Sequence, residues 1–158
     1  MNSSSVTSNI DSNSLVQKTV YPILFSIAFA HLLNDLLQAV IPAAYPILKE
    51  NFNLSFTQIG LITLAYQLAA SILQPLVGLY TDKKPKPFSQ IFGMLFTMSG
   101  IVLLSYAAHF SMIIVAVVLV GIGSSIFHPE ASRISFLASG GKRGLAQSIF
   151  QVGGNMGT

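Results

Sequence analysis

Residues 87–129, PFSQIFGMLFTMSGIVLLSYAAHFSMIIVAVVLVGIGSSIFHP, decide the fold class because they contain no Asp, Glu, Lys or Arg. A bilayer core is about 30 Å thick, and an α-helix needs about 20 residues to cross it. The stretch is therefore too long for one core helix. It predicts two membrane crossings joined by a tight turn at His109.

The composition of the whole chain agrees with this prediction. Charged residues make up 8% of the 158 residues, whereas soluble domains carry about 25%. The absence of cysteine excludes disulfides, thiolate nucleophiles and cysteine-based zinc sites. The net charge of +3 comes from basic residues scattered between apolar runs, which does not favour nucleic-acid binding. We expect an all-α multi-span membrane protein embedded in a lipid bilayer.

Apolar runs predict five spans, at about 20–48, 56–80, 88–107, 111–137 and 145–158. Residues 1–18 are rich in Ser, Asn and Thr at their start and are expected to form a disordered cytoplasmic tail, followed by a transmembrane domain over 19–158. The last run is too short for a crossing, and a half-crossed helix would leave carbonyls unpaired in hydrocarbon. We therefore expect about four and a half spans of a longer protein.

The orientation follows from the basic residues between the runs, because Lys and Arg are retained on the cytoplasmic face. One side carries only Lys49, and the other carries Lys18, Lys83, Lys84, Lys86, Lys142 and Arg143. The amino terminus is therefore expected in the cytoplasm.

Asp35 is the clearest functional candidate, because an ionised side chain inside a span is costly and is kept for a reason. At 100° per residue, His31, Asp35, Gln38 and Pro42 share one flank of the first span, and Asn34 borders them. One interpretation is a water-filled path in which Asp35 takes and gives a proton, with His31 as relay. The alternative is structural, with Asp35 tying helices together.

Two other spans carry polar side chains that could serve either function or helix packing. Gln67 and Gln74 share a face of the second span, where amides can bind substrate or join helices. His128 in the fourth span either lines a cavity or packs against a neighbouring helix. In the third span, Gly93, Thr97 and Gly100 are expected to permit close helix packing only.

No cofactor or metal is expected. A metal site needs three or four converging ligands, and His31, His109 and His128 fall on different segments at apparently different depths. Motifs of soluble catalysis are missing from the sequence. An intramembrane enzyme built on His31, Asp35 or His128 would lack a nucleophile, so an enzyme is not expected.

The segment 78–83, GLYTDK, resembles the loop signature of the major facilitator superfamily between its second and third spans. Pro85 stands where that signature usually has Gly, and Lys86 stands one place early. A closer resemblance, to the fosmidomycin-resistance branch, covers nearly everything after the tail and tolerates these prolines. It is carried by HLLNDLLQ (31–38), LQPLVGLYTDK (73–83), FHPEASR (127–133) and GLAQSIFQVGGN (144–155).

This resemblance implies a twelve-span, proton-coupled exporter of a small drug-like compound in a bacterial inner membrane, with the rest of the transporter missing from this chain. It implies proton coupling at Asp35. From the polar flanks of the spans we expect His31 to assist Asp35, and we expect substrate contacts from Asn34, Gln38, Gln67, Gln74 and His128. The resemblance also implies a cytoplasmic latch of Gly78, Asp82 and Lys83 that meets the i,i+3 pair Glu130 and Arg133. Transport of a sugar or organic anion, and an inactive truncated remnant, remain open alternatives.

Overall fold

The computed structural model describes residues 18–83 and 88–158, which form five helices. The helices are α1 (Tyr21–Asn51), α2 (Phe56–Lys83), α3 (Ser89–Ser105), α4 (Phe110–Leu137) and α5 (Arg143–Gly157). The predicted all-α class and the order of five helices are confirmed. By length and composition, α1, α2 and α4 can cross a membrane, and α3 is a shorter apolar helix of 17 residues. The expected tail up to residue 17 and the loop lysines Lys84 and Lys86 lie outside the described residues.

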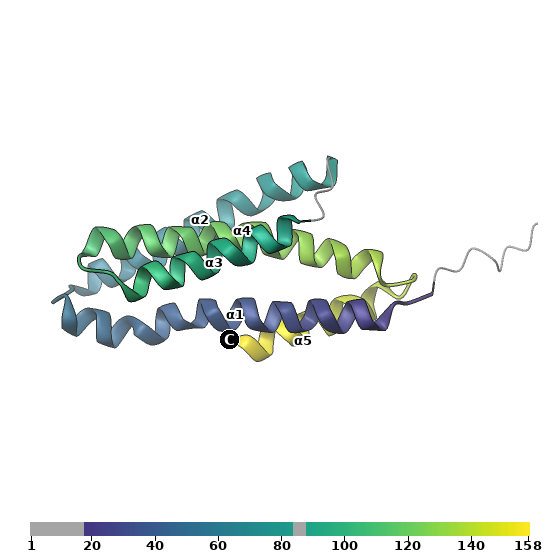
Figure 1. Cartoon of the computed structure of the whole chain (residues 1–158), viewed down its shortest axis with the longest axis horizontal. Helices are drawn as coiled ribbons and strands as arrows, with labels where there is room; N and C mark the ends of the chain where they lie inside the picture. Colours follow the sequence, from purple (N-terminus) through teal and green to yellow (C-terminus); the bar gives the residue numbers. More distant parts are fainter. Residues whose placement is uncertain (1–17, 84–87) are drawn as a thin grey trace, which may run out of the picture.

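The helices pack in two groups that run along the long axis of the molecule (Figure 1). α4 is the centre of one group, with α2 and α3 packed against it, while α5 packs along the first half of α1. A backbone hydrogen bond of 2.9 Å from Val20 N to Ala138 O ties the start of α1 to the α4–α5 loop. These two segments therefore lie at the same end of the bundle.

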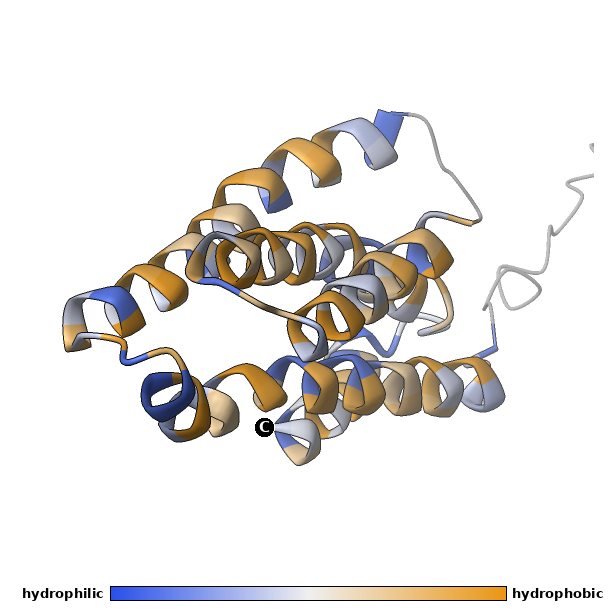
Figure 2. Cartoon of the chain, turned by 60° about the vertical axis from the view of Figure 1, so that its left-hand side comes forward, coloured by the Kyte–Doolittle hydropathy of each residue, from blue (hydrophilic) through white to orange (hydrophobic). Residues whose placement is uncertain are grey.

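The outer surfaces of the helices are apolar. Figure 2 shows hydrophobic residues along the helices and hydrophilic residues gathered at helix ends and loops. Large side chains such as Phe25, Phe29 and Leu79 are more than 60% exposed. Contiguous apolar exteriors of this kind are unfavourable in water and suit a lipid environment.

The start of α2 is fixed by a reciprocal pair of hydrogen bonds between Ser55 and Gln58. Ser55 N donates to Gln58 Oε1 at 2.9 Å, and Gln58 N donates to Ser55 Oγ at 3.2 Å. This is a capping box, which satisfies amide groups that have no partner within the helix. Asn53, with a φ of 50°, makes the tight turn that precedes it.

Glycines bring α3 and α4 into backbone contact. A Cβ at Gly100 would lie 2.6 Å from Val120 Cγ2 and 2.7 Å from the Ala116 carbonyl oxygen. Small residues at such crossings allow helix backbones to approach closely, which is a main source of packing energy in a membrane. The predicted role of Gly93 and Gly100 in close packing agrees with this geometry.

Gly100→Ala is expected to destabilise the protein by about 1–3 kcal/mol, because the new methyl group collides with the α4 backbone. Thermal unfolding in detergent, followed by circular dichroism, should show a lower midpoint. Gly60→Ala in α2 is the matched control, since a Cβ at Gly60 meets no atom within 4 Å. Equal midpoints for the two variants would contradict the packing account.

Candidate functional site

Asp35 lies in the middle of α1, and four nitrogen atoms surround its carboxylate. Two of them are amide nitrogens on the same helix: Asn34 Nδ2 is 3.2 Å and Gln38 Nε2 is 3.3 Å from Oδ1. His31 Nε2 lies 3.1 Å from Oδ2, one helical turn away. The predicted polar flank of α1 therefore converges on one carboxylate.

His128 reaches the same carboxylate from α4. Its Nε2 lies 3.3 Å from Asp35 Oδ1, and its Nδ1 lies 2.9 Å from the carbonyl oxygen of Ser124. The rings of His31 and His128 are edge to face, with centroids 5.1 Å apart. His128 thus bridges α4 to α1.

His31 is held by α5 as well as by α1. Its Nδ1 lies 2.9 Å from the carbonyl oxygen of Phe150, and its ring stacks on the Phe150 ring with centroids 4.0 Å apart. The ring fits because Gly154 has no side chain, since a Cβ there would overlap the imidazole. His31 is consequently 4% exposed and fixed in orientation.

The idea that the histidines lie at different depths is wrong for His31 and His128. His31 lies ten residues after Tyr21, and His128 lies nine residues before Leu137. These two ends belong to the same side of the bundle, so at 1.5 Å per residue both rings lie about 14–15 Å from it. Counting residues from this end of the bundle could have shown that His31 and His128 lie at the same depth. His109, at the other end of α4, is exposed and far along the helix from the other two.

A cavity of about 460 Å³, open on one side, lies between α1, α2 and α4 next to this cluster. Its walls combine the acid and one histidine with neutral polar and small side chains. They are Asp35, Gln38, Ala39, Pro42, Tyr66, Gln74, Ser124, His128 and Thr158. The Asp35 carboxylate therefore lies at the wall of an open cavity and is not sealed in the core.

The predicted substrate contacts fall in three positions. Gln38, Gln74 and His128 line the cavity, whereas Asn34 is buried behind it and touches the carboxylate. Gln67 is exposed and is not among the residues that line the cavity. The role of all five residues in substrate binding stays a prediction.

Tyr66 and Thr97 were missed as members of the site. The Tyr66 hydroxyl donates to Gln38 Oε1, which orients the Gln38 amide towards Asp35. The Thr97 hydroxyl donates to Asn34 Oδ1 at 3.2 Å, although packing alone was expected there. Neither residue carries a charge, and their partners lie 28 and 63 residues away in sequence, so no local pattern marks them.

The predicted latch residues lie in the C-terminal parts of α2 and α4. Arg133 Nη1 donates to Glu130 Oε1 at 3.1 Å, and Glu130 is 3% exposed. A Cβ at Gly78 would lie 3.7 Å from Pro129 Cβ, so α2 approaches α4 beside this pair. Asp82 and Lys83 are exposed, and within the described ranges no ion pair joins them to Glu130 or Arg133.

The cluster also offers three side chains, two imidazoles and one carboxylate, of types that bind divalent metals. One atom each from His31, Asp35 and His128 lies within 4.8 Å of the other two. The Asp35 oxygens already contact both imidazoles and two amides directly. We therefore treat the cluster as a hydrogen-bonded set.

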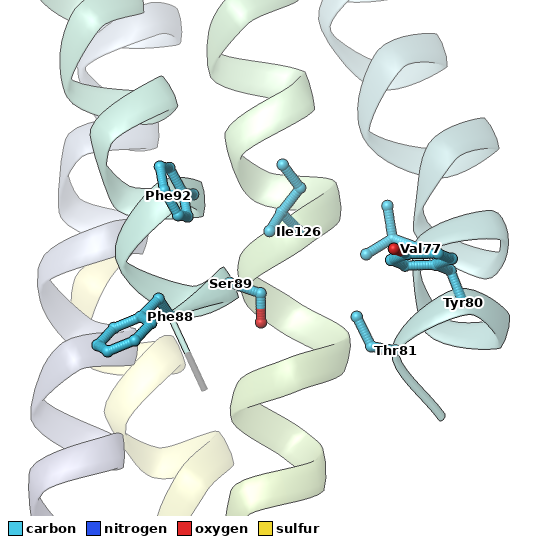
Figure 3. A pocket seen from close by; sticks show the side chains of 7 residues that line it. All are labelled: Val77, Tyr80, Thr81, Phe88, Ser89, Phe92 and Ile126. Atoms are coloured by element: carbon cyan, nitrogen blue, oxygen red, sulfur yellow. The ribbon is translucent and has the colours of Figure 1, made fainter. Parts of the chain in front are cut away.

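A second cavity, of about 390 Å³, lies between the last turns of α2, the first turns of α3 and α4 at Ile126 (Figure 3). Its walls are mainly aromatic and aliphatic, and the Thr81 hydroxyl already donates to the Gly78 carbonyl oxygen. Among the described residues, no charged side chain lines it; the lining residues are Val77, Tyr80, Thr81, Phe88, Ser89, Phe92 and Ile126. The described walls of this cavity therefore lack the carboxylate and imidazole groups that line the Asp35 cavity.

Comparisons with known proteins give a consistent picture. The family model described as Major Facilitator Superfamily matches residues 27–158. The chain is 57% identical over 141 residues to the fosmidomycin resistance protein of Escherichia coli (strain K12), covering 89% of this chain and 35% of that protein. It is 52% identical over 139 residues to the uncharacterized MFS-type transporter YfnC of Bacillus subtilis (strain 168), covering 88% and 34%. The chain thus spans about a third of the length of these relatives, and no solved structure matches it.

Proposed function

The chain belongs to the major facilitator superfamily, and on that premise we propose that it is part of a proton-coupled exporter of a small drug-like compound. This family places the protein among membrane transporters rather than enzymes. The name of the fosmidomycin resistance protein supports a solute of the fosmidomycin type. Transport measurements need a chain of the relatives' length that contains this sequence, which we call the full-length transporter.

The observation that carries the proposal is the Asp35 carboxylate at the wall of an open cavity, in contact with two imidazoles. A charge inside a span costs about 2.5–3.5 kcal/mol on insertion scales. Exchange of a proton at the His31–Asp35 pair changes the charge that faces the cavity. If the inward- and outward-open states solvate that charge differently, proton binding shifts the balance between them.

The test is efflux from proteoliposomes that contain the full-length transporter and are loaded with fosmidomycin. A pH gradient should accelerate fosmidomycin efflux, and a proton ionophore that collapses the gradient should remove the acceleration. An efflux rate that is the same with and without the pH gradient would contradict proton coupling. Movement of a sugar or a simple organic anion in place of fosmidomycin would contradict the proposed solute.

Tyr66→Phe is expected to weaken fosmidomycin binding about fivefold, measured as a higher Michaelis constant. The substitution removes the hydrogen bond that orients Gln38, and such a bond contributes about 1 kcal/mol. Tyr80→Phe, on the same helix but outside the Asp35 cavity, is the matched control. Equal constants for the two variants would rule out a role for Tyr66 in binding.

We propose that Gly78, Asp82 and Lys83 form a cytoplasmic latch with Glu130 and Arg133. Two observations support this proposal. α2 and α4 approach closely at Gly78, and within the described part of the chain a buried carboxylate oxygen on α4, Glu130 Oε2, has no hydrogen-bond partner. A cationic or amide donor that enters in another conformation would satisfy it.

The proposed topology places residues 19–158 in the bacterial inner membrane with the amino terminus in the cytoplasm. On a cysteine-free background, Glu50→Cys is expected to react with a membrane-impermeant maleimide from outside the cell. Lys142→Cys should react only after the inner membrane is permeabilised, because it lies at the opposite end of the bundle. The reverse labelling pattern would invert the topology.

A further inference from the structure

The nearest oxygen atom to each ring nitrogen of His31 and of His128 is a carbonyl or carboxylate oxygen, which has no hydrogen to donate. Each Nδ1 lies 2.9 Å from a backbone carbonyl oxygen, that of Phe150 for His31 and that of Ser124 for His128. Each Nε2 lies 3.1 or 3.3 Å from one oxygen of the Asp35 carboxylate. The Ser124 hydroxyl is a more distant neighbour of His128 Nδ1, at 3.2 Å against 2.9 Å for the Ser124 carbonyl oxygen.

A neutral imidazole carries one N–H and one lone pair. In this arrangement it would leave a nitrogen lone pair facing an oxygen lone pair, which is repulsive. A protonated Asp35 could donate to only one of the two rings. All four contacts are hydrogen bonds only when both rings are imidazolium and Asp35 is ionised. The two amide donors on Oδ1 fit the ionised carboxylate as well.

We infer that the cluster holds two protons at once, one on each imidazole, with Asp35 as their shared counter-ion. His128 is then a second proton-coupling residue, in addition to the His31–Asp35 pair. This inference rests on the proposed function, and it assigns the exchanged protons to the Nε2 atoms of His31 and His128.

The two protons also hold the helices together. His128 joins α4 to α1 through Asp35, and His31 joins α1 to α5 through Phe150. Removal of either proton turns one of these contacts into a repulsion between lone pairs, so the ring must move. Proton release is therefore linked to a change in how α1 packs against α4 and α5.

Few other charges can influence the cluster from the helices packed against it. From α2, Tyr66 is the titratable side chain that touches it, through Gln38. α3 contains no titratable residue, and α5 contains only Arg143, at its first position. On α4, Glu130 and Arg133 are paired with each other. Asp35 is thus the anion that the two imidazolium rings share.

Histidine ¹⁵N NMR of the full-length transporter in lipid bilayers tests the proton count, because imidazolium is distinguished from either neutral tautomer. His31→Gln and His128→Gln assign the signals, and His109→Gln is a control outside the cluster. Near neutral pH, His31 and His128 should both be imidazolium, and both should become neutral in Asp35→Asn. A neutral ring at either position in the unmodified protein would overturn the inference, whether or not Asp35→Asn folds.

His128→Gln provides a functional arm, since glutamine can donate an N–H to Asp35 but cannot release it. The number of protons exchanged per fosmidomycin, measured from the gradients at which net flux reverses, should fall by one. His109→Gln should leave it unchanged. An unchanged ratio in His128→Gln would overturn the inference while the proposed function stands. Absence of proton-driven flux in the unmodified protein would instead overturn the proposed function, and the NMR result would still decide the proton count.

Discussion

Asp35→Asn in the full-length transporter is expected to reduce uphill, pH-driven fosmidomycin export by about 100-fold. Without the Asp35 carboxylate the two imidazoles have no counter-ion and become neutral, so the cluster loses the protons that it exchanges. A hundredfold loss corresponds to about 2.7 kcal/mol, since each 1.36 kcal/mol is a tenfold change in rate. The amide can still accept a hydrogen bond from one ring, but it carries no charge with which to hold protons.

The measurement compares two modes of transport in the same proteoliposomes. Export against a fosmidomycin gradient needs coupled protons, whereas exchange of labelled for unlabelled fosmidomycin at equal pH does not. Asp35→Asn should lose the first mode and keep the second. Retention of uphill export would exclude Asp35 from coupling. Loss of both modes would show that Asp35 serves substrate binding or folding rather than coupling alone.

Gly153→Leu is expected to have the largest effect on folding. A Cβ at Gly153 would overlap the carbonyl oxygen of Ala28 and lie 2.7 Å from its carbonyl carbon. The α1 backbone cannot yield there without disturbing His31, three residues further along the helix. We expect a loss of about 3 kcal/mol or more, the upper end of the cost of overpacking.

Fluorescence-detected size-exclusion chromatography of the membrane extract should show little monodisperse Gly153→Leu protein. Gly144→Leu is the matched control on the same helix, because a Cβ at Gly144 meets no atom within 4 Å. A monodisperse peak of equal height for both variants would mean that α5 does not pack on α1 as described.

The helices could be predicted from the sequence because a membrane span is a local property. Twenty apolar residues in a row are recognisable without knowledge of their neighbours. The polar flank of α1 was predictable for the same reason, since the 100° helical repeat alone brings His31, Asp35 and Gln38 to one side.

The meeting of His128 with Asp35 is a tertiary property and was not predicted. The contact between His128 and Asp35 depends on the position of α4 along α1 and on the rotation of α4 about its own axis. Close packing of the helices determines both. Gly121 sets part of that packing, because a Cβ there would lie 2.6 Å from the Tyr66 carbonyl oxygen of α2. The hydroxyls of Tyr66 and Thr97 were missed because a neutral residue in an apolar run gives no sign of its partner on another helix.

Proton release on substrate binding tests the central claim most directly. Purified full-length transporter in weakly buffered detergent solution is mixed with fosmidomycin, and the pH is followed together with the heat of binding. If substrate and protons compete through the Asp35 cluster, binding should acidify the solution, and Asp35→Asn should bind without acidifying it. Fosmidomycin binding with no change in pH in the unmodified protein would contradict the account.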